Sequence, residues 1–422
     1  MTTTPLRVVV IARAVMPLHG VGGLERSVHD LVRHLAERGV GVTLIVPPAS
    51  VRHQSWTDPF AHPQISVRHV SYLTFPLANR RGTTVVDRST AYLLYGYRAG
   101  RLAHALARDG AADIIHGFGA SLLGAAMSPH VVPLVLNPQG LEEFGATATT
   151  QTVMKRAGYA PLRWAVRRAA RAADCIIATD VALEPTVARH LTPRPGQMET
   201  IPNGIDLVAL AATAGPAGGA MLRQRSGIDA DERVLLSVGR LEFNKGFDVL
   251  ARALGRASGS PSFAQRPWRW VIVGAGPYRS HIERTAADAG IETRTTFAGR
   301  ASEADLHAWY EAASVFVHPT RYEGSSLVTL EAMAHRRAVV ATNAGGLPDK
   351  VRPGVNGWIV APDDVDALAS ALEAALADDD RLKAMGAASR SIVEREFSWS
   401  VIADRHIAMY RRLLSGTPAS TT

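Results

Sequence analysis

Short apolar runs alternate with longer amphipathic stretches in the first half of the chain. The apolar runs are rich in Val and Ile and too short for helices, so they predict buried strands. Polar and apolar positions recur at helical spacing in residues 23–38 and 90–108, which predicts two helices. The alternation is typical of an α/β fold with a doubly wound parallel sheet. The predicted strands lie at residues 7–12, 41–46, 65–70, 113–116, 131–136 and 175–178.

The alternation starts again in the second half, where a strand at 234–238 leads to a glycine turn and a helix from Phe247. Farther along, 315–317 predicts a strand, 326–337 a helix and 338–341 a second strand. This order of strand, loop, helix and strand is the repeating unit of a parallel sheet covered by helices. Small and polar residues predict a connector at 211–220, a loop at 255–267 and a frayed end at 415–422.

Length and composition narrow the class of protein. A chain of 422 residues is too long for one ordinary core and predicts two domains of about 200 residues. Hydrophobic residues make up 47% and charged residues 20%, which favours a folded globular chain. The single Cys175 lies in a predicted strand and is interpreted as a buried structural thiol. No apolar run approaches the roughly 18–20 residues of a membrane span, and 8–12 is too short for a signal-peptide core, so we expect a cytoplasmic protein.

The positive charge lies mostly in the first half. Residues 1–208 hold 21 Lys and Arg against 14 Asp and Glu, a difference of +7, and the rest holds 25 against 24, which together give the net +8. The densest basic stretch is 155–171, KRAGYAPLRWAVRRAAR. One interpretation is a solvated helix whose apolar side packs on the sheet. The other is an interfacial helix that docks on an anionic membrane surface, on the inner face of the membrane.

Two carboxylates mark the predicted strand–loop–helix unit near residue 320. Glu323 lies in the loop and Glu331 in the helix, and Gly324, Ser325 and Ser326 lie at the helix start. Free backbone N–H groups and the positive end of the helix dipole make such a start a place for phosphate. A carboxylate in the helix can accept hydrogen bonds from a ribose, and one in the loop from another sugar. The alternative is that Glu323 caps the helix and Glu331 is a solvated helix residue.

Other candidates lie at predicted strand ends. Arg240 and Lys245, in the glycine turn that starts at Gly239, suit a diphosphate, although a surface loop would also hold such residues. A lone histidine is more often structural, but His116 ends a predicted parallel strand, where open sheets bind ligands. Gly22 and Gly23 follow the first strand, and the turn VIVGAGP, with Gly274 and Gly276, follows another; the latter lacks the third glycine of a dinucleotide motif because Arg279 stands there.

These segments resemble the retaining glycosyltransferases of family 4, which have the GT-B fold. The resemblance rests on YEG…LEAMA…VVAT…GGLPD from Tyr322 to Asp349, on GRLEFNKG from Gly239, and on DIIH, PNGID, VIVGAGP, FAGR and FSW. It covers nearly the whole chain, from residue 7 to about 414. One departure is Phe118, which stands where the family often has the second histidine of H-x-H.

The resemblance implies two Rossmann-like domains that face a cleft: 1–208 on the acceptor side, 209–396 on the nucleotide-sugar side, and 397–422 as a closing helix that crosses back, with a tail. It implies retaining transfer of a sugar from a nucleotide diphosphate sugar, with UDP or GDP, to a sugar, a lipid-linked intermediate or a small molecule. Gln139, Glu142 and Glu143 lie in the loop 137–152, where acceptor choice would be settled.

The resemblance also implies the roles of the site residues. Glu331 would hold the ribose and Glu323 the hydroxyls of the donated sugar. Arg240 and Lys245, with the N–H groups around Gly324, Ser325 and Ser326, would stabilise the leaving diphosphate, and His116 would lie near the reacting bond. The remaining contacts with the nucleotide sugar would come from Gly22, Gly23, Asn203, Gly239, Gly274, Gly276 and Arg300.

No cofactor and no metal are predicted. The D-x-D sequence at Asp364 and Asp366 precedes an Ala/Leu helix and is interpreted as helix capping. Two other functions stay open: a nucleotide-sugar epimerase on the same fold, and a nucleic-acid-binding protein suggested by the pI of about 9.9. The second lacks aromatic residues interleaved on a basic surface, so no nucleic-acid partner is predicted.

Overall fold

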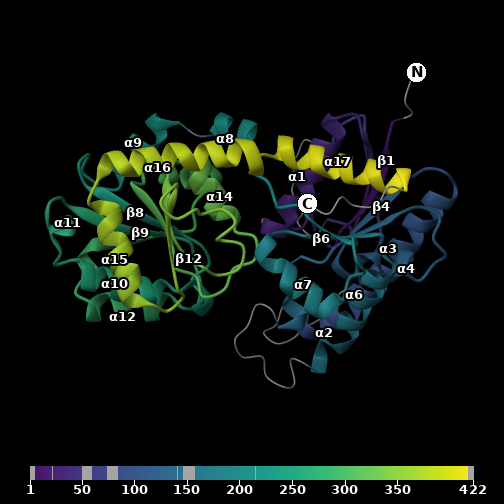
Figure 1. Ribbon diagram of the computed structural model, residues 1–422, viewed down its shortest axis with the longest axis horizontal. Helices are drawn as coiled ribbons and strands as arrows, with labels where there is room; N and C mark the ends of the chain where they lie inside the picture. The colour runs from purple at the N-terminus through teal and green to yellow at the C-terminus, as the bar shows by residue number, and fades with distance from the viewer. Residues whose placement is uncertain are drawn as a thin grey trace. The chain divides into compact units, whose positions relative to one another are not determined.

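The computed structural model describes residues 5–20, 22–49, 59–73, 84–139, 141–145, 157–213 and 215–416. The predictions for part of the loop 137–152, for Lys155 and for the end of the tail therefore lie outside the described residues. The chain folds into two compact units (Figure 1). The first comprises the residues up to Asn203 and those from Trp399 onward, and the second comprises Gly204–Ser398.

A seven-stranded parallel sheet forms the centre of the first unit. Its strand order is β3-β2-β1-β4-β5-β6-β7. The chain therefore adds strands on one side of β1 and then returns to its other side to place β4. The strands are β1 (Arg7–Ile11), β2 (Gly41–Val46), β3 (Ile65–His69), β4 (Ile114–Phe118), β5 (Leu134–Asn137), β6 (Cys175–Ala178) and β7 (Met198–Thr200).

Helices cover both faces of this sheet because successive strand residues point to opposite sides. Val9 and Ile11 pack with the helices α2 (Thr84–Ser89), α3 (Ala91–Arg108), α4 (Leu123–Ala126), α6 (Ala160–Ala172) and α7 (Glu184–Leu191). Val8 and Val10 pack with α1 (Gly23–Glu37) and α17 (Trp399–Ser415). Cys175 is buried, as expected, and burial raises the pKa of its thiol to about 12.

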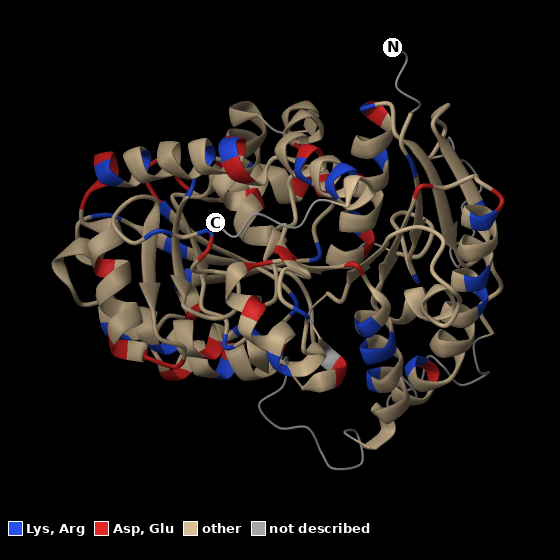
Figure 2. Ribbon diagram, turned by 45° about the vertical axis from the view of Figure 1, so that its right-hand side comes forward, with Lys and Arg blue, Asp and Glu red and all other residues tan. Residues whose placement is uncertain are grey.

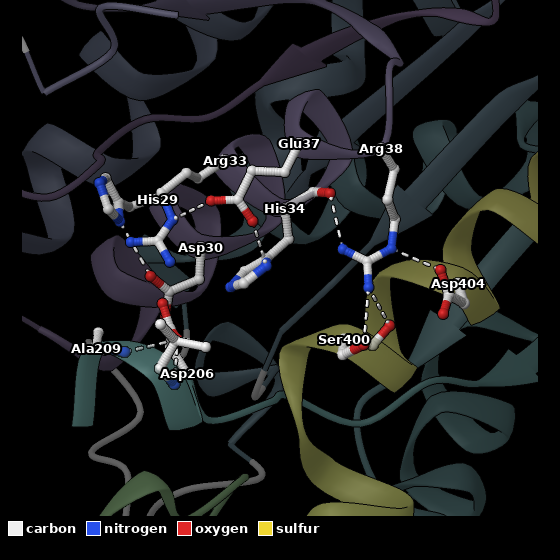
Figure 3. Close-up of polar contacts among 11 residues, drawn as sticks. His29, Asp30, Arg33, His34, Glu37, Arg38, Asp206, Ala209, Ser400 and Asp404 are labelled. Atoms are coloured by element: carbon white, nitrogen blue, oxygen red, sulfur yellow. Dashed lines mark hydrogen bonds and ion pairs between the residues drawn. The ribbon is translucent and has the colours of Figure 1, made fainter. Parts of the chain in front are cut away.

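Helix α17 is held on α1 by polar contacts as well as by the core (Figure 3). The Arg38 guanidinium, just after α1, donates from Nε to Asp404 Oδ1 at 2.6 Å and from Nη2 to the Ser400 carbonyl at 2.8 Å. The ring of His34 stacks on Trp399 with centroids 5.9 Å apart. The last helix of the chain is therefore an integral part of the first unit.

The second unit repeats the arrangement with six parallel strands in the order β10-β9-β8-β11-β12-β13. Strand β8 lies in the middle, beside both β9 and β11. The first three strands are added toward one edge and the next three toward the other. The strands are β8 (Arg233–Val238), β9 (Trp268–Val273), β10 (Thr295–Gly299), β11 (Val315–His318), β12 (Ala338–Thr342) and β13 (Gly357–Val360).

The helices of the second unit bury two apolar clusters, one on each face of its sheet. Phe247, Leu250 and Trp270 belong to one cluster, and Tyr310, Phe316 and Met333 to the other. The helices are α8 (Leu207–Thr213), α9 (Pro216–Arg225), α10 (Phe247–Ala257), α11 (Pro261–Ala264), α12 (Arg279–Asp288), α13 (Glu303–Ala312), α14 (Leu327–Ala334), α15 (Val365–Leu376) and α16 (Asp379–Ile392).

Several element predictions were wrong in detail. The connector expected at 211–220 is largely helical, because Pro216 starts α9 after the extended Gly215 and Leu222 anchors the helix in the core. The loop expected at 255–267 contains the end of α10 and the short α11. The strand expected at 131–136 begins only at Leu134, and the strand expected to end at His116 continues to Phe118. Among the described residues, no helix is both long and apolar enough to span a bilayer.

Candidate functional site

The loops after β8 and β11 converge at one place in the second unit. These two strands are neighbours, and their connections run to opposite edges of the sheet. Ligands bind at such a switch point in open α/β sheets, outside the carboxyl ends of the strands. The loop after β8 carries Gly239, Arg240 and Lys245, and the loop after β11 carries Glu323.

A buried ion pair joins these two loops. Lys245 Nζ lies 2.7 Å from Glu323 Oε2, and each side chain is only 14% exposed. His318, the last residue of β11 and fully buried, contacts the same oxygen from Nε2 at 2.7 Å. Among the described residues no hydrogen bond reaches Glu323 Oε1. The carboxylate is thus held through one oxygen, and its other oxygen remains available.

Charge fixes the protonation state of this cluster. Burial opposes ionisation of Glu323, but the Lys245 ammonium and the hydrogen bond from His318 outweigh it and hold the pKa of the carboxyl well below its usual range. Burial lowers the pKa of His318 although Glu323 acts in the opposite direction. A neutral His318 that donates from Nε2 and an ionised Glu323 therefore describe the cluster at pH 7.

The loop after β12 supports the turn at Glu323 from behind. Gly345 has a φ of +52°, and a Cβ built there would lie 1.7 Å from the carbonyl oxygen of Glu323. The Gly346 N–H also donates to the Gly324 carbonyl at 3.2 Å. Only glycine allows this approach at position 345, which explains why the sequence GGLPD belongs to the site.

Helix α14 begins directly after Glu323. Ser326 is its N-cap residue, but its hydroxyl pairs with the Thr329 hydroxyl at 2.9 Å and forms no capping bond. The hydroxyl oxygen of Ser325 is buried without a partner among the described residues. The first turn contains no acidic residue. Uncapped N–H groups and an unpaired hydroxyl at a helix start favour an anion there.

Glu331 lies in the same helix but is buried, at 4% exposure. Its Oε2 accepts a hydrogen bond of 2.8 Å from the Tyr310 hydroxyl of α13. The alternative of a solvated helix residue is therefore wrong. The predicted contact with a ribose stays a prediction.

Arg240, Gly274, Gly276 and Arg300 also follow the carboxyl ends of strands in the second unit, but they do not contact the ion pair. Arg240 is 75% exposed and pairs with Glu242 at 2.7 Å. Gly274 and Gly276 follow β9, and the exposed Arg300 follows β10. Asp364 caps α15 by accepting from the Ala367 N–H at 2.9 Å, and Asp366 pairs with Arg256. The capping interpretation of this D-x-D sequence is confirmed.

In the first unit, Gly22 is the N-cap residue of α1 and Gly23 its first residue, beyond the carboxyl end of β1. His116 was predicted to end its strand, but β4 continues to Phe118. Its imidazole is fully buried, with Nδ1 2.7 Å from the Tyr410 hydroxyl. Burial and the neighbouring His406 keep its pKa well below the usual value. This placement gives His116 a structural contact with α17. Asn203 is the last residue of the unit before the second one begins.

Most of the basic stretch lies in α6 (Ala160–Ala172). This helix is amphipathic, and its Leu162 and Val166 belong to the core of the first unit. Arg163 donates to the Glu143 carbonyl, and Arg167 donates to the His190 carbonyl and lies over Phe144. Trp164 is 53% exposed. Positions of Lys and Arg, blue on the ribbon of Figure 2, recur along helices of this unit. The helix therefore packs its apolar side on the sheet and presents Trp164 with basic residues outward.

Sequence reasoning missed His318, Arg321 and Tyr310, three side chains that hold the predicted ones. His318 ends a parallel strand, so the rule that singled out His116 would have found it. Arg321 and Tyr310 gave no comparable signal, because an arginine in a polar loop and a tyrosine in a helix are common.

Comparisons with known proteins agree with the motifs. The family model described as Glycosyltransferase Family 4 matches residues 21–208, and the model described as Glycosyl transferases group 1 matches residues 220–392. A sucrose-phosphate synthase structure from Thermosynechococcus elongatus superposes with a TM-score of 0.72, covering 98% of this chain and 100% of that one, at 24% identity. That likeness shows the fold.

Two relatives are closer in sequence. A GDP-mannose-dependent alpha-(1-6)-phosphatidylinositol monomannoside mannosyltransferase from Mycobacterium tuberculosis is 34% identical over 215 residues, 49% of this chain and 54% of that protein. The chain thus spans about half the length of that relative. An alpha-maltose-1-phosphate synthase from Mycolicibacterium smegmatis is 32% identical over 295 residues, 67% of this chain and 73% of that protein.

The two parallel-sheet units, the family matches in both halves and the relatives agree with one another. The chain belongs to the GT-B glycosyltransferases of family 4, the glycosyl transferases group 1.

Proposed function

We propose that this chain transfers a glycosyl group from a nucleotide diphosphate sugar to an acceptor, with retention at the anomeric carbon. The observation that carries the proposal is the buried Lys245–Glu323 pair at the switch point of the second unit, next to the uncapped start of α14. A cation and a helix start suit a diphosphate, and a fixed carboxylate suits sugar hydroxyls.

The pair would rearrange when the nucleotide sugar binds. A phosphate oxygen takes the Lys245 ammonium as its partner, and Glu323 Oε1 accepts from a hydroxyl of the sugar. His318 keeps Glu323 Oε2 in place during this exchange, because its hydrogen bond does not involve the ligand. The cluster is therefore prepared for a ligand that carries both an anion and hydroxyl groups.

The transfer step breaks the bond between the anomeric carbon and the diphosphate oxygen and forms a bond to the acceptor oxygen on the same face. The acceptor proton passes to the departing diphosphate. Negative charge grows on the terminal phosphate, and Lys245 and the N–H groups at the start of α14 would stabilise it. We propose that these groups take the part that a divalent ion plays in other glycosyltransferases.

The relatives favour particular substrates for testing. The name of the mannosyltransferase relative contains GDP-mannose and a phosphatidylinositol monomannoside, so GDP-mannose and a lipid-linked acceptor are the first substrates to test. UDP- and ADP-linked sugars follow, since the pattern of charges around Lys245 does not distinguish the bases. A membrane-bound acceptor also suits the outward face of α6.

The test is a transfer assay with each nucleotide sugar, with and without acceptor, followed by proton NMR of the product. We expect release of nucleoside diphosphate that depends on acceptor, an anomeric configuration equal to that of the substrate, and little change on adding EDTA. Consumption of the nucleotide sugar without acceptor would instead indicate an epimerase. Loss of transfer with EDTA and its recovery with Mg²⁺ would refute the role given to Lys245.

A further inference from the structure

Arg321 lies two residues before Glu323 in the loop after β11, and its side chain is only 9% exposed. Its guanidinium donates to Asp248 in a bidentate manner, from Nη1 to Oδ1 and from Nη2 to Oδ2, both at 2.8 Å. Nε donates to Asp363 Oδ1 at 2.7 Å, and Nη1 also donates to the Phe243 carbonyl at 2.6 Å. One side chain thus contacts the Phe243 turn, the first turn of α10 and the loop before α15.

These contacts hold the turn that carries Lys245. The turn spans Phe243–Lys245, and the guanidinium also lies over the Phe243 ring, 4.1 Å from its centroid. The Asn244 carbonyl accepts from the Arg321 N–H and from the Thr320 hydroxyl, both at 2.8 Å. The Lys245 turn is therefore bonded, through the carbonyls of Phe243 and Asn244, to the loop that carries Glu323.

The two loops also meet in direct backbone contact. Gly246, with a φ of +66°, lies so close to the Pro319 carbonyl that a Cβ there would be 2.0 Å from its oxygen. Such an approach leaves no room for an intervening side chain. The relative position of the two loops is thus set by a small number of specific contacts. Arg321 makes two of the polar ones, from its backbone N–H to Asn244 and from Nη1 to Phe243, and its side chain adds the bidentate bond to Asp248.

The charges in this place are complementary. Burial disfavours the charged forms of Arg321 and Asp248, but their mutual hydrogen bonds raise the pKa of the arginine and lower that of the aspartic acid. A lysine could supply one charge at this position. It could not supply the planar fork that reaches two carboxylates and a carbonyl together.

We propose that Arg321 is a positioning residue for the sugar-nucleotide site: its clamp on the Phe243–Lys245 turn fixes Lys245 relative to Glu323. This inference rests on the proposed function, in which Lys245 holds the diphosphate and Glu323 the sugar. Arg321 itself touches neither ligand. A shift of about 1 Å between catalytic groups can cost about 10²-fold in rate, so the clamp governs turnover through geometry.

The experiment compares Arg321→Lys and Arg321→Gln with the control Arg233→Lys. Arg233 is a matched control because it is equally buried, at 7% exposure, and pairs with Asp379 at 3.0 Å, but it begins β8 and so lies at the opposite end of that strand. We expect both Arg321 variants to lose about 10²-fold in kcat/KM and to bind nucleoside diphosphate at least tenfold more weakly. Arg233→Lys should lose thermal stability and keep both values.

A second measurement needs no ligand. Backbone hydrogen exchange of peptides covering 243–247 and 319–324 should accelerate together in the Arg321 variants and stay unchanged in Arg233→Lys. If exchange accelerates in these two segments but the wild-type chain shows no transfer activity, the proposed function is refuted while the positioning role of Arg321 stands. Unchanged exchange, or an equal loss of kcat/KM in Arg233→Lys, would overturn the positioning role of Arg321.

Discussion

Replacing Glu323 by Gln tests the central ion pair, because Gln keeps the shape of the side chain and removes its charge. The amide oxygen can still accept from His318, so that contact is preserved. At the observed separation of 2.7 Å, the gross attraction between Lys245 and Glu323 is about 6 kcal/mol for an effective dielectric constant of about 20. Desolvation of the two groups offsets part of this attraction.

Breaking a buried pair by removing one charge typically costs about 3–5 kcal/mol. Both side chains here keep 14% exposure, and Lys245 can still donate to the amide oxygen. We therefore expect Glu323→Gln to lower the free energy of unfolding by about 3 kcal/mol at pH 7.

The difference from wild type should depend on pH in a defined direction. The pKa of Glu323 is lowered in the folded chain. Its stabilising contribution is therefore complete above the unfolded value of about 4.3, declines below that value, and is lost as the pH falls through the lower folded value. Urea unfolding at pH 7 and at pH 4 or lower should show the gap between wild type and Glu323→Gln narrowing on acidification.

Binding of free nucleoside diphosphate separates the two partners of the pair. Glu323→Gln releases Lys245 from its carboxylate, so calorimetry should show affinity equal to or higher than that of wild type, while turnover falls. Lys245→Met removes the cation and should weaken binding. Equal weakening by both variants would refute the division of roles between the two residues. A stability gap that stays constant from pH 7 down to the lowest pH at which both chains fold would refute the buried-charge argument.

Two further predictions concern Glu331 and α6. Glu331→Ala should weaken nucleotide binding by roughly 1.5–3 kcal/mol, because charged hydrogen bonds to the ribose are lost. Tyr310→Phe serves as its control, since it removes the 2.8 Å bond to Glu331 and leaves the carboxylate. Unchanged affinity in Glu331→Ala would refute the ribose assignment. Replacing Arg168 and Arg171 by Gln should weaken binding to anionic vesicles, measured by flotation, by about 2 kcal/mol, at about 1 kcal/mol per charge. Arg163 and Arg167 are left in place because they donate to the Glu143 and His190 carbonyls. Absence of wild-type binding at low salt would refute the membrane assignment.

The alternation of apolar runs predicted the fold because parallel strands buried on both faces read as continuous Val and Ile runs. The strand predicted at 65–70 appears as Ile65–His69, and the helix predicted at 90–108 appears as Ala91–Arg108. The failures lie where small residues form helices. At 211–220 the Gly and Ala content suggested a connector, but α8 and α9 are stabilised by packing of Leu210 and Leu222, which composition does not reveal.

The sequence predicted which loops carry the candidate residues but not which of these residues contact one another. Motif spacing placed Lys245 and Glu323 at strand ends, and the strand order places those ends side by side. Which charges pair cannot be read from spacing, because Lys245 and Glu323 are 78 residues apart and Arg240 was an equal candidate. The structure separates them: Lys245 is buried against Glu323, and Arg240 extends outward to Glu242. The strand end predicted at His116 was wrong for a local reason, since two more residues continue the strand. The imidazole contacts Tyr410 of α17, and its place near the reacting bond stays a prediction.

The two sheets share one strand order, yet their switch points differ in chemistry. In the second unit the strands next to the switch lead to Lys245 and Glu323, held by His318 and Arg321. In the first unit the corresponding strand ends at the apolar Phe118, and the loop after β1 leads to Gly22 and Gly23. Charge that develops on a diphosphate needs groups fixed before the reaction, because reorganising them during transfer costs free energy. Only a site with its cations and helix start already fixed meets that need, so the second unit should bind the nucleotide sugar and control the rate of bond breaking. The first unit then contributes an apolar strand end at Phe118, a feature that suits recognition of an acceptor, while the contact of Gly22 and Gly23 with the nucleotide sugar stays a prediction.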